Sequence, residues 1–530
     1  MREGTDARTH RRTVAVVRTL FLCVCASAAS VRLSAQCPDG TPPPCARPAA
    51  RAAAAPPATS VAVLYFDNVS RDTSDAYIAD GLTEELIARL GQIERLQVKS
   101  RTAVQRYRGR PIDDPTTLGR TLGVAHLVSG SIRRGGGRLR VTVELTRAST
   151  GVRVWGDTYE RGSDDLMAVE ADIAQAIAVG VGGRLAPTER RTLVARPTGN
   201  AEAYDHFLRG SYFIAQRSPA AARRALTEYE AAARLDPGFA RAYGRIGLAY
   251  GLFYDWGWPY PGLDPDSLLE RGSAAAATAL RLDSLSADGW LATAGLRQFR
   301  FPTTFAGAAS AYRRALALDA RSAEAWHFYG GLLSALGQDS AAAAAFRRAL
   351  ELEPERLITF ENLGWLRYAQ HRHAEAAQLV DSGLALDPQA YFLYTDRAAI
   401  ALNLGDTARA RAAIAAAVRT RPPDYSMTTE PLVAAMEARG GDTASARARM
   451  ERLVGQFADA EHPRLTEGYE AALGFALIGD GARAIALLER VSPRGLILGY
   501  YLRDPGFDRI RSEPRFQSLV AEMRPPGGGP

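Results

Sequence analysis

Lysine is almost absent from this 530-residue chain, and cysteine is confined to its first 45 residues. Lys99 is the only lysine and no segment has the order GxxxxGK[ST], so a phosphate-binding loop of that type is excluded. Residues 46–530 contain no cysteine, which excludes a thiol nucleophile or a cysteine-based zinc site there. No GxSxG segment occurs, so a serine hydrolase of the nucleophile-elbow type is excluded as well.

The net charge of +7 is concentrated at the N-terminus. Residues 1–60 hold eight arginines against Glu3, Asp6 and Asp39, a net +5, which leaves only +2 for residues 61–530. The near-total use of arginine for lysine fits a coding bias better than a phosphate-binding design. The charge therefore does not indicate a nucleic-acid partner.

Residues 1–35 have the organisation of a secretory signal peptide. Five arginines precede a short apolar run at residues 19–26, and small residues follow, with cleavage expected after Ala28 or Ala35. The alternative is an uncleaved anchor over residues 13–31, although Arg18 interrupts that stretch and about 20 apolar residues are needed for a span. We expect a periplasmic or cell-envelope protein that meets the membrane only through this segment.

Residues 36–59 are rich in proline and alanine and read as a linker. Cys37 and Cys45 flank a proline-rich loop in it. After export they could close a disulfide, or remain two unpaired thiols, because four prolines stiffen the loop between them.

Residues 60–196 predict a domain of α/β type, a mixed sheet with flanking helices. Residues 61–66 form a continuous apolar run typical of a buried strand, and residues 76–90 repeat apolar side chains at helical spacing. Further strands are expected at residues 96–98, 127–132, 139–145 and 152–159, with helices at 117–122 and 166–185. Asp67, Asp80, Glu84 and Glu85 lie near the end of the first strand, but without a nearby histidine or lysine we interpret them as turn and solvated helix residues.

The segments VAVLYFDNVSRDTSDAYIADGLTEELIARL, SRTAV and LGVAHLVSGSIRRGGGRLRVTVELTRASTGVRVWGDTYER resemble, in this order, the TolB amino-terminal-like domain over residues 60–185. The resemblance implies an α/β fold used in periplasmic or sensory assemblies, commonly placed before tetratricopeptide repeats, with no established catalytic residues. Relatives often carry an upstream kinase or DNA-binding domain, whereas this chain has a signal-like segment there.

Residues 200–500 repeat a helical unit. Acidic residues at recurring turns, Asp236, Asp283, Asp319, Glu353 and Asp387, are 47, 36, 34 and 34 residues apart. A period of about 34 residues is that of the tetratricopeptide repeat. The best unit, residues 323–356, has the expected order of Trp326, Gly330, Ala342, Phe346, Ala349 and Pro354. We expect about seven units in an all-α superhelix (an α-solenoid), closed by a cap and a disordered tail at residues 501–530.

The first helices of such units normally line a concave face that binds extended or helical peptides. By spacing, the candidate partner-binding residues are Glu324, His327, Glu361, Asn362, Trp365, Tyr368 and Thr395. Trp365 and Tyr368 fit as binding anchors, and core packing explains them equally well. An aromatic insert at residues 253–261 either folds onto its own rings or contacts a ligand.

No catalytic, cofactor or metal site is expected, and His371 and His373 read as solvated turn residues. The sequence therefore predicts a non-enzymatic adaptor, exported or envelope-associated, that recruits protein partners through its repeats. The alternative is a regulatory or sensor protein, cytoplasmic or anchored, whose kinase, cyclase or transcription output lies on another chain.

Overall fold

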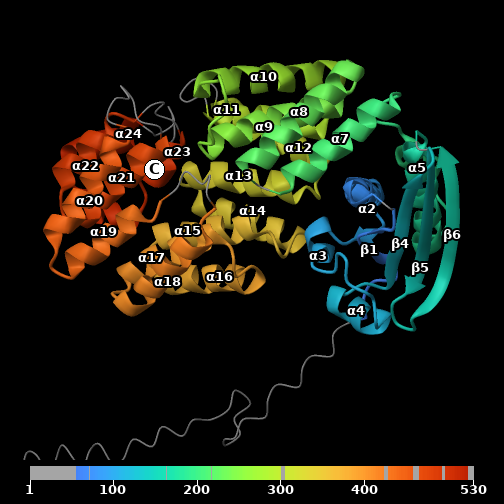
Figure 1. The fold of residues 1–530 in the computed structure, drawn as a ribbon, viewed down its shortest axis with the longest axis horizontal. Coiled ribbons are helices and arrows are strands. Elements are labelled where there is room, and N and C mark those ends of the chain that lie inside the picture. Colours follow the sequence, from blue (N-terminus) through green and yellow to red (C-terminus); the bar gives the residue numbers. More distant parts are fainter. Residues whose placement is uncertain are drawn as a thin grey trace, which may run out of the picture. The chain divides into compact units, whose positions relative to one another are not determined.

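The computed structural model describes residues 55–522 except residues 71, 163, 217, 300–304, 423–427, 458–464 and 492–495 (Figure 1). Residues from Pro56 onward form one compact unit. The expected signal or anchor segment, Cys37, Cys45 and most of the linker lie outside the described residues. No helix within the described ranges is long and apolar enough to cross a bilayer.

A mixed sheet opens the described chain. Its strands are β1 (Ser60–Val63), β2 (Asp67–Asn68), β3 (Gln97–Val98), β4 (His126–Gly135), β5 (Arg138–Arg147) and β6 (Val152–Gly162). The order is β3-β1-β4-β5-β6, and β2 pairs with β4. β1 is parallel to β3 and β4, whereas β4, β5 and β6 run antiparallel through short turns. The mixed sheet expected from the strand pattern is therefore present.

Helices cover both faces of β1, which explains its unbroken apolar run. Val61 and Val63 point into a core shared with α2 (Ala76–Gly91) and α5 (Leu166–Gly182). Ala62 points to the opposite face, where a second cluster includes residues of α3 (Arg101–Gln105) and α4 (Pro115–Leu122). β5 buries only alternate residues, as expected for a strand with one face toward the core.

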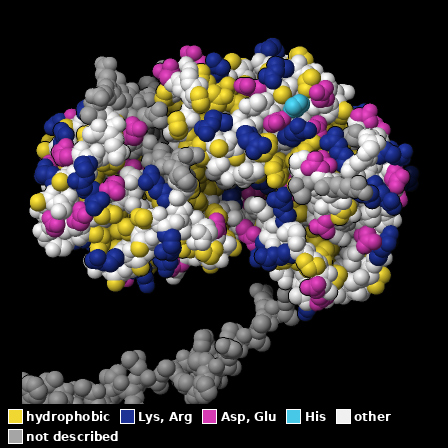
Figure 2. Space-filling view, in the orientation of Figure 1, with side chains coloured by type: hydrophobic (Ala, Val, Ile, Leu, Met, Phe, Trp, Pro, Cys, Tyr) yellow, Lys and Arg dark blue, Asp and Glu magenta, His cyan; other side chains and the backbone are white. Residues whose placement is uncertain are grey.

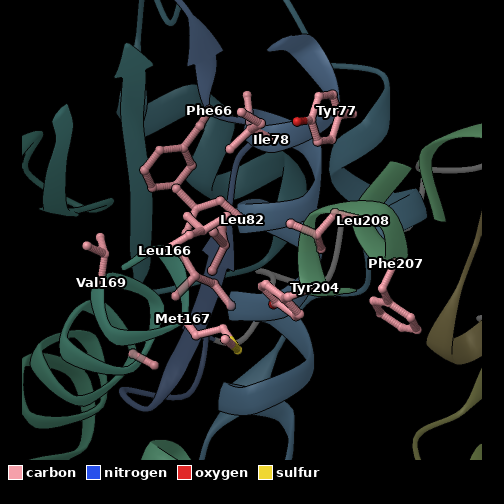
Figure 3. Close-up of a cluster of buried hydrophobic side chains, with 14 of the residues drawn as sticks. Phe66, Tyr77, Ile78, Leu82, Leu166, Met167, Val169, Tyr204, Phe207 and Leu208 are labelled. Atoms are coloured by element: carbon pink, nitrogen blue, oxygen red, sulfur yellow. The ribbon is translucent and has the colours of Figure 1, made fainter. Parts of the chain in front are cut away.

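The core of the sheet continues into the helical repeats. After α6 (Pro187–Val194), the first repeat helix α7 (Ala201–Ile214) packs on α2. Figure 3 shows Tyr204 and Leu208 of α7 beside Leu82 of α2 and Met167 of α5. One buried cluster therefore spans residues on both sides of 196–200, where the α/β domain was expected to end and the repeats to begin.

Sixteen helices, α7 to α22, follow as eight antiparallel pairs in the described residues. The pairs are α7 with α8 (Pro219–Leu235), α9 (Ala240–Asp255) with α10 (Pro265–Leu282), α11 (Ala287–Phe299) with α12 (Phe305–Leu318), α13 (Ala323–Ala335) with α14 (Asp339–Leu352), α15 (Leu357–Ala369) with α16 (His373–Leu386), α17 (Tyr391–Asn403) with α18 (Thr407–Thr420), α19 (Glu430–Arg439) with α20 (Thr443–Gly455), and α21 (Leu465–Leu477) with α22 (Gly481–Leu488). The expected number was about seven. The pair not among the units named from the sequence is α11 with α12.

The recurring acidic residue between units has a local structural role. The side-chain oxygens of Asp236, Asp283, Asp319 and Asp387 each accept a hydrogen bond from the backbone N–H two residues later, at 2.8 to 3.0 Å. These Asx turns fix the path from one pair to the next. The turn signature that reveals the repeats is therefore a backbone requirement and not a binding motif.

The C-terminal segment contains α23 (Leu496–Tyr501), the 3-10 helix η2 (Pro505–Ile510) and α24 (Pro514–Glu522). Phe507 and Phe516 are fully buried in one cluster with Phe475 of α21, so residues 505–522 cover the last repeat. In contrast, α23 turns back and contacts α11 and α13, near the middle of the array (Figure 1). This return was not expected from the sequence.

Candidate functional site: a cavity on the first helices of the repeats

A cavity of about 260 Å³ lies on the side of the array formed by the first helix of each pair. We call this side the groove face. Side chains from α9, α13, α15, α17, α19 and α21 line the cavity, and α23 contributes Tyr500 and Tyr501 to its wall. Elements far apart in the sequence therefore build one site.

Six of the seven predicted partner-binding residues line this cavity: His327, Glu361, Asn362, Trp365, Tyr368 and Thr395. The 34-residue period explains their convergence, because equivalent positions of successive first helices stack beside one another. Glu324 lies elsewhere, at a second cavity, where its carboxylate pairs with Arg245 at 3.3 Å. The structure thus groups the predicted residues, while their binding of a partner remains a prediction.

Trp365 is covered by the chain itself. The Tyr500 ring of α23 stacks on it with ring centroids 3.7 Å apart and planes 21° apart. The Tyr500 hydroxyl also donates a hydrogen bond to Asn362 Oδ1 at 3.1 Å. Arg503 anchors the same segment by donating to the Ser334 carbonyl at 2.7 Å and pairing with Asp339 at 2.8 Å.

Tyr368 is a packed residue, 5% exposed, and its hydroxyl lies 3.4 Å from Asp504 Oδ1. Tyr469 donates to the other oxygen of the same carboxyl at 2.7 Å. Asn403 donates to the Tyr368 hydroxyl at 2.6 Å. The sequence left open whether Tyr368 and Trp365 are binding anchors or core residues. Tyr368 is packed in the interior, whereas Trp365 is half-buried against α23.

Five carboxyl groups line the cavity: Asp255, Glu361, Asp396, Glu470 and Asp504. Burial raises the pKa of Asp255 to about 7, and burial with repulsion from Asp504 raises the pKa of Asp396 to about 8. Burial raises the pKa of Glu470 to about 8 even though the Thr428 N–H donates to it. For Glu361, burial is again the main cause, followed by repulsion from Asp396 and Asp255, and its pKa lies well above the usual value.

The sequence analysis did not name Asp396, Glu470 or Asp504 as site residues, and it included Asp255 and Trp256 only as members of the aromatic insert. The repeat period could have revealed Asp396, because it stands 34 residues after the predicted Asn362. Asp255 and Trp256 come from the aromatic insert, and Asp504 and Tyr500 from the returning C-terminal segment, where no repeat spacing applies.

The aromatic insert mostly folds onto its own rings. Phe253 and Trp258 are buried, and Phe253 meets Tyr260 edge to face at 5.1 Å. Trp256 is the member that reaches the cavity. The insert therefore packs mainly against its own aromatic rings. It also places the Trp256 side chain at the candidate site, where a ligand could contact it.

A second cavity, of about 990 Å³, lies between α2 and the groove face of α9, α11 and α13. Lys99, the single lysine, is among its lining residues. Arg321, from the turn before α13, donates to the carbonyl oxygens of Leu96 at 2.9 Å and of Val98. Arg321 thus makes a second connection between the sheet and the repeats, in addition to the packing of α7 on α2.

Buried charges join α2 to the repeats, which corrects the interpretation of Asp80 and Glu85 as solvated. Asp80 is 8% and Glu85 7% exposed. Burial alone would raise the pKa of Glu85, but the guanidinium groups of Arg241 and Arg89 hold it below its usual value. Glu170, fully buried, has its pKa raised to about 8 by burial and by repulsion from Glu85, and it accepts a hydrogen bond from Tyr204 at 2.7 Å. These acids position elements of the fold.

His371 is exposed in the turn between α15 and α16, as expected, and its ring faces Asp508 at 3.7 Å. Within the described ranges, no three histidine, cysteine, aspartate or glutamate side chains are placed to hold a metal ion together. Figure 2 shows basic and acidic side chains interspersed over the visible face.

Comparison with known sequences supports the repeats. The model of the tetratricopeptide repeat family matches residues 323–356, the unit with the best sequence pattern. The chain contains tetratricopeptide repeats. A Rhizobium meliloti (strain 1021) protein that carries the provisional name adenylate cyclase 3 is 30% identical over 215 residues. The match covers 41% of this chain and only 36% of that relative.

Solved tetratricopeptide-type structures are similar over parts of the chain. PilF of Pseudomonas aeruginosa is 23% identical, with 41% of this chain and 92% of that chain covered and a TM-score of 0.33. Yeast Tom70 is 16% identical, with 68% and 82% covered and a TM-score of 0.37. YrrB, described as a tetratricopeptide-repeat protein with an unusual peptide-binding site, is 17% identical, with 37% and 93% covered and a TM-score of 0.26.

Proposed function

We propose that this protein is a non-enzymatic adaptor of the cell envelope that binds a protein partner on the groove face of its tetratricopeptide repeats. The observation that carries the proposal is the convergence of six residues, predicted from repeat spacing alone, on one cavity that is also lined by half-buried aromatic side chains. Tetratricopeptide arrays generally bind peptides or proteins on this face. The cavity gives such a partner a defined point of entry.

The adaptor role is tested by site-specific photo-crosslinking in the source bacterium. A photoreactive amino acid at Trp365 would report from the groove face, and the same amino acid at Arg348, on the exposed side of α14, is the matched control. We expect a discrete crosslinked protein from position 365 and none from position 348. Equal or absent crosslinks from both positions would contradict an adaptor that uses this face.

Export rests on the signal-like residues 1–35. An alkaline phosphatase fusion after residue 60 should be active in cells, because that enzyme folds only in an oxidising compartment. An inactive but full-length fusion would refute the envelope assignment. Mass spectrometry of the mature N-terminus then separates cleavage after Ala28 or Ala35 from retention as an anchor.

The α/β part is proposed to be a TolB amino-terminal-like domain. Its support is the ordered series of sequence motifs over residues 60–185, which includes the buried first strand and the three-strand antiparallel run. In this proposal the domain places the repeats at the envelope assembly in which the partner resides.

A regulatory role is the second candidate, favoured by the partial match to the relative named as an adenylate cyclase. In that case the output would lie on another chain. The crosslinking experiment separates the two: a kinase, cyclase or transcription factor captured from position 365 favours regulation, and an envelope component favours the adaptor.

A further inference from the structure

The cavity on the groove face combines aromatic walls with carboxyl groups. Trp365, Tyr469, Tyr500 and Tyr501 contribute rings. Tyr469 and Tyr501 stack with centroids 4.3 Å apart, as Trp365 and Tyr500 do at 3.7 Å, so the walls are held in place. Aromatic faces attract cations through their negative electrostatic potential.

Two carboxylate oxygens at this cavity lack a hydrogen-bond donor. Glu361 Oε2 and Asp396 Oδ2 are both shielded from solvent and form no hydrogen bond with any described residue. A buried polar atom without a partner costs about 1–3 kcal/mol, and more where it carries charge. These two unpartnered oxygens therefore lower the stability of the fold, and a ligand that donates hydrogen bonds to them would offset that loss.

Positive charge is scarce among the described lining residues. Arg356 is the only arginine or lysine there, and its guanidinium pairs with Glu353 at 2.9 Å. Against it stand five carboxyl groups, including Asp255, for which burial is the single cause of a raised pKa. The composition of the cavity therefore favours a cationic ligand over an anionic or neutral one.

We propose that this cavity binds an organic cation, a guanidinium or ammonium group, through Glu361 and Asp396 with Trp365 and Tyr500 as aromatic walls. The volume of about 260 Å³ suits one basic side chain or one small amine and is below the roughly 300 Å³ at which pockets for larger ligands begin. If the cation is a side chain of a protein partner, this inference rests on the proposed function. If the cation is a free amine, it is independent of the proposed function.

Proton release accompanies binding in this scheme. The titratable groups that face Glu361 and Asp396 are the other three carboxyls, His327, Arg356, and the phenols of Tyr368, Tyr469, Tyr500 and Tyr501. Burial and mutual repulsion hold the carboxyl pKa values above the usual range, so a proton leaves when a cation pairs with the carboxylate. Affinity for the cation should therefore rise between pH 6 and pH 9.

The test is isothermal titration of the purified full chain with N-acetyl-arginine amide, and with N-acetyl-citrulline amide as its neutral isostere. We expect saturable binding of the arginine compound and at least about tenfold weaker binding of the citrulline compound. Equal binding of both, or no binding of the arginine compound up to about 10 mM, would overturn the proposal. Two further ligands distinguish a protein side chain from a free amine as the natural cation. Tighter binding of a glycine–serine peptide with one central arginine indicates a side chain, and tighter binding of agmatine indicates a free amine.

Variants assign the site. E361Q with D396N should abolish arginine-amide binding and its pH dependence, while E351Q, an exposed carboxylate of α14, should leave both unchanged. Because the amides remove two buried groups that ionise at high pH, the double variant should melt at a higher temperature than the wild type at pH 9, which shows that it is folded. Undiminished binding by the double variant would overturn the assignment. Binding of arginine amide without any crosslink from position 365 would leave the cation site standing and remove only the adaptor proposal.

Discussion

Tyr500 lies flat against Trp365, so a residue of the C-terminal segment covers the aromatic ring that repeat spacing marks as a binding anchor. The Tyr500 hydroxyl reaches Asn362, one turn earlier on the same helix α15. The chain thus occupies part of its own groove face, and the remaining cavity lies beside this contact.

Removal of the Tyr500 ring should loosen the return of α23. For Y500A we expect a loss of about 0.5–1.5 kcal/mol from the ring contact, in addition to lost apolar burial. Y500F keeps the stack and loses only the hydrogen bond to Asn362, so it should cost about 1 kcal/mol or less. Urea unfolding followed by circular dichroism measures both, and an equal loss in the two variants would show that the ring stack contributes nothing.

Two neighbouring glycines of α13 offer a matched test of packing. A Cβ at Gly330 would lie 2.8 Å from the ring of Phe346, whereas a Cβ at Gly331 would meet nothing within 4 Å. We expect G330A to lower the free energy of unfolding by about 1–3 kcal/mol. G331A should raise it by up to about 1 kcal/mol because alanine favours the helix. Thermal melts of the two variants should therefore shift in opposite directions.

Arg89 joins α2 to the segment before α7. Its guanidinium donates to the carbonyls of Leu193 and Ala195 at 2.8 and 2.9 Å and lies 3.4 Å from Glu85 and 3.7 Å from Glu170. R89M should cost about 3–5 kcal/mol because it removes a buried positive charge that faces two buried acids, together with the hydrogen bonds to the Leu193 and Ala195 carbonyls.

At pH 9, replacement of Glu170 by glutamine should recover part of the loss from R89M, because the pKa of Glu170 is about 8 even beside Arg89 and its ionised form then lacks that cation. R348M, which breaks an exposed pair on α14, is the control and should change stability by no more than about 1 kcal/mol. Denaturant titration of R89M, of R89M combined with E170Q, and of R348M measures these changes in the free energy of unfolding. A wild-type stability for R89M would refute a structural role for this cluster.

The buried carboxyl of Asp255 should make stability fall as pH rises. Its folded-state pKa of about 7 exceeds the unfolded value of about 3.9, so its contribution is fully present below pH 4 and is lost as pH rises toward 7. D255N removes this titration, and its advantage over wild type should grow from pH 5 to pH 8, with a slope of at most about 1.4 kcal/mol per pH unit. The measurement is a series of melts over that range, with D381N, an exposed carboxylate of α16, as the control.

Much of the fold could be predicted from the sequence because its signals are local or periodic. The first strand was predicted at residues 61–66 and lies at Ser60–Val63, and the helix predicted at 76–90 spans Ala76–Gly91. Apolar spacing identifies such elements whatever surrounds them. The Asx turns at Asp236 and Asp387 made the repeats visible for the same reason.

Contacts between distant segments could not be predicted in this way. Glu85 has the sequence context of a solvated helix residue beside Arg89 of the same helix, but the structure also brings Arg241 of α9 to it at 3.1 Å and leaves it 7% exposed. Tyr500 likewise stands in a short apolar segment without repeat spacing. Tyr500 contacts Trp365 because α23 folds back onto the middle of the repeats, and no local sequence pattern predicts that return.

The position of Lys99 has a practical consequence. Because this chain has one lysine, reagents that acylate side-chain amines can modify only one residue, and that residue lines the cavity between α2 and the repeats. Once the N-terminal α-amine is blocked, a fluorophore introduced by amine chemistry would therefore report from this one position. Changes in its emission would follow the approach or separation of the sheet and the repeat helices in the unmodified sequence.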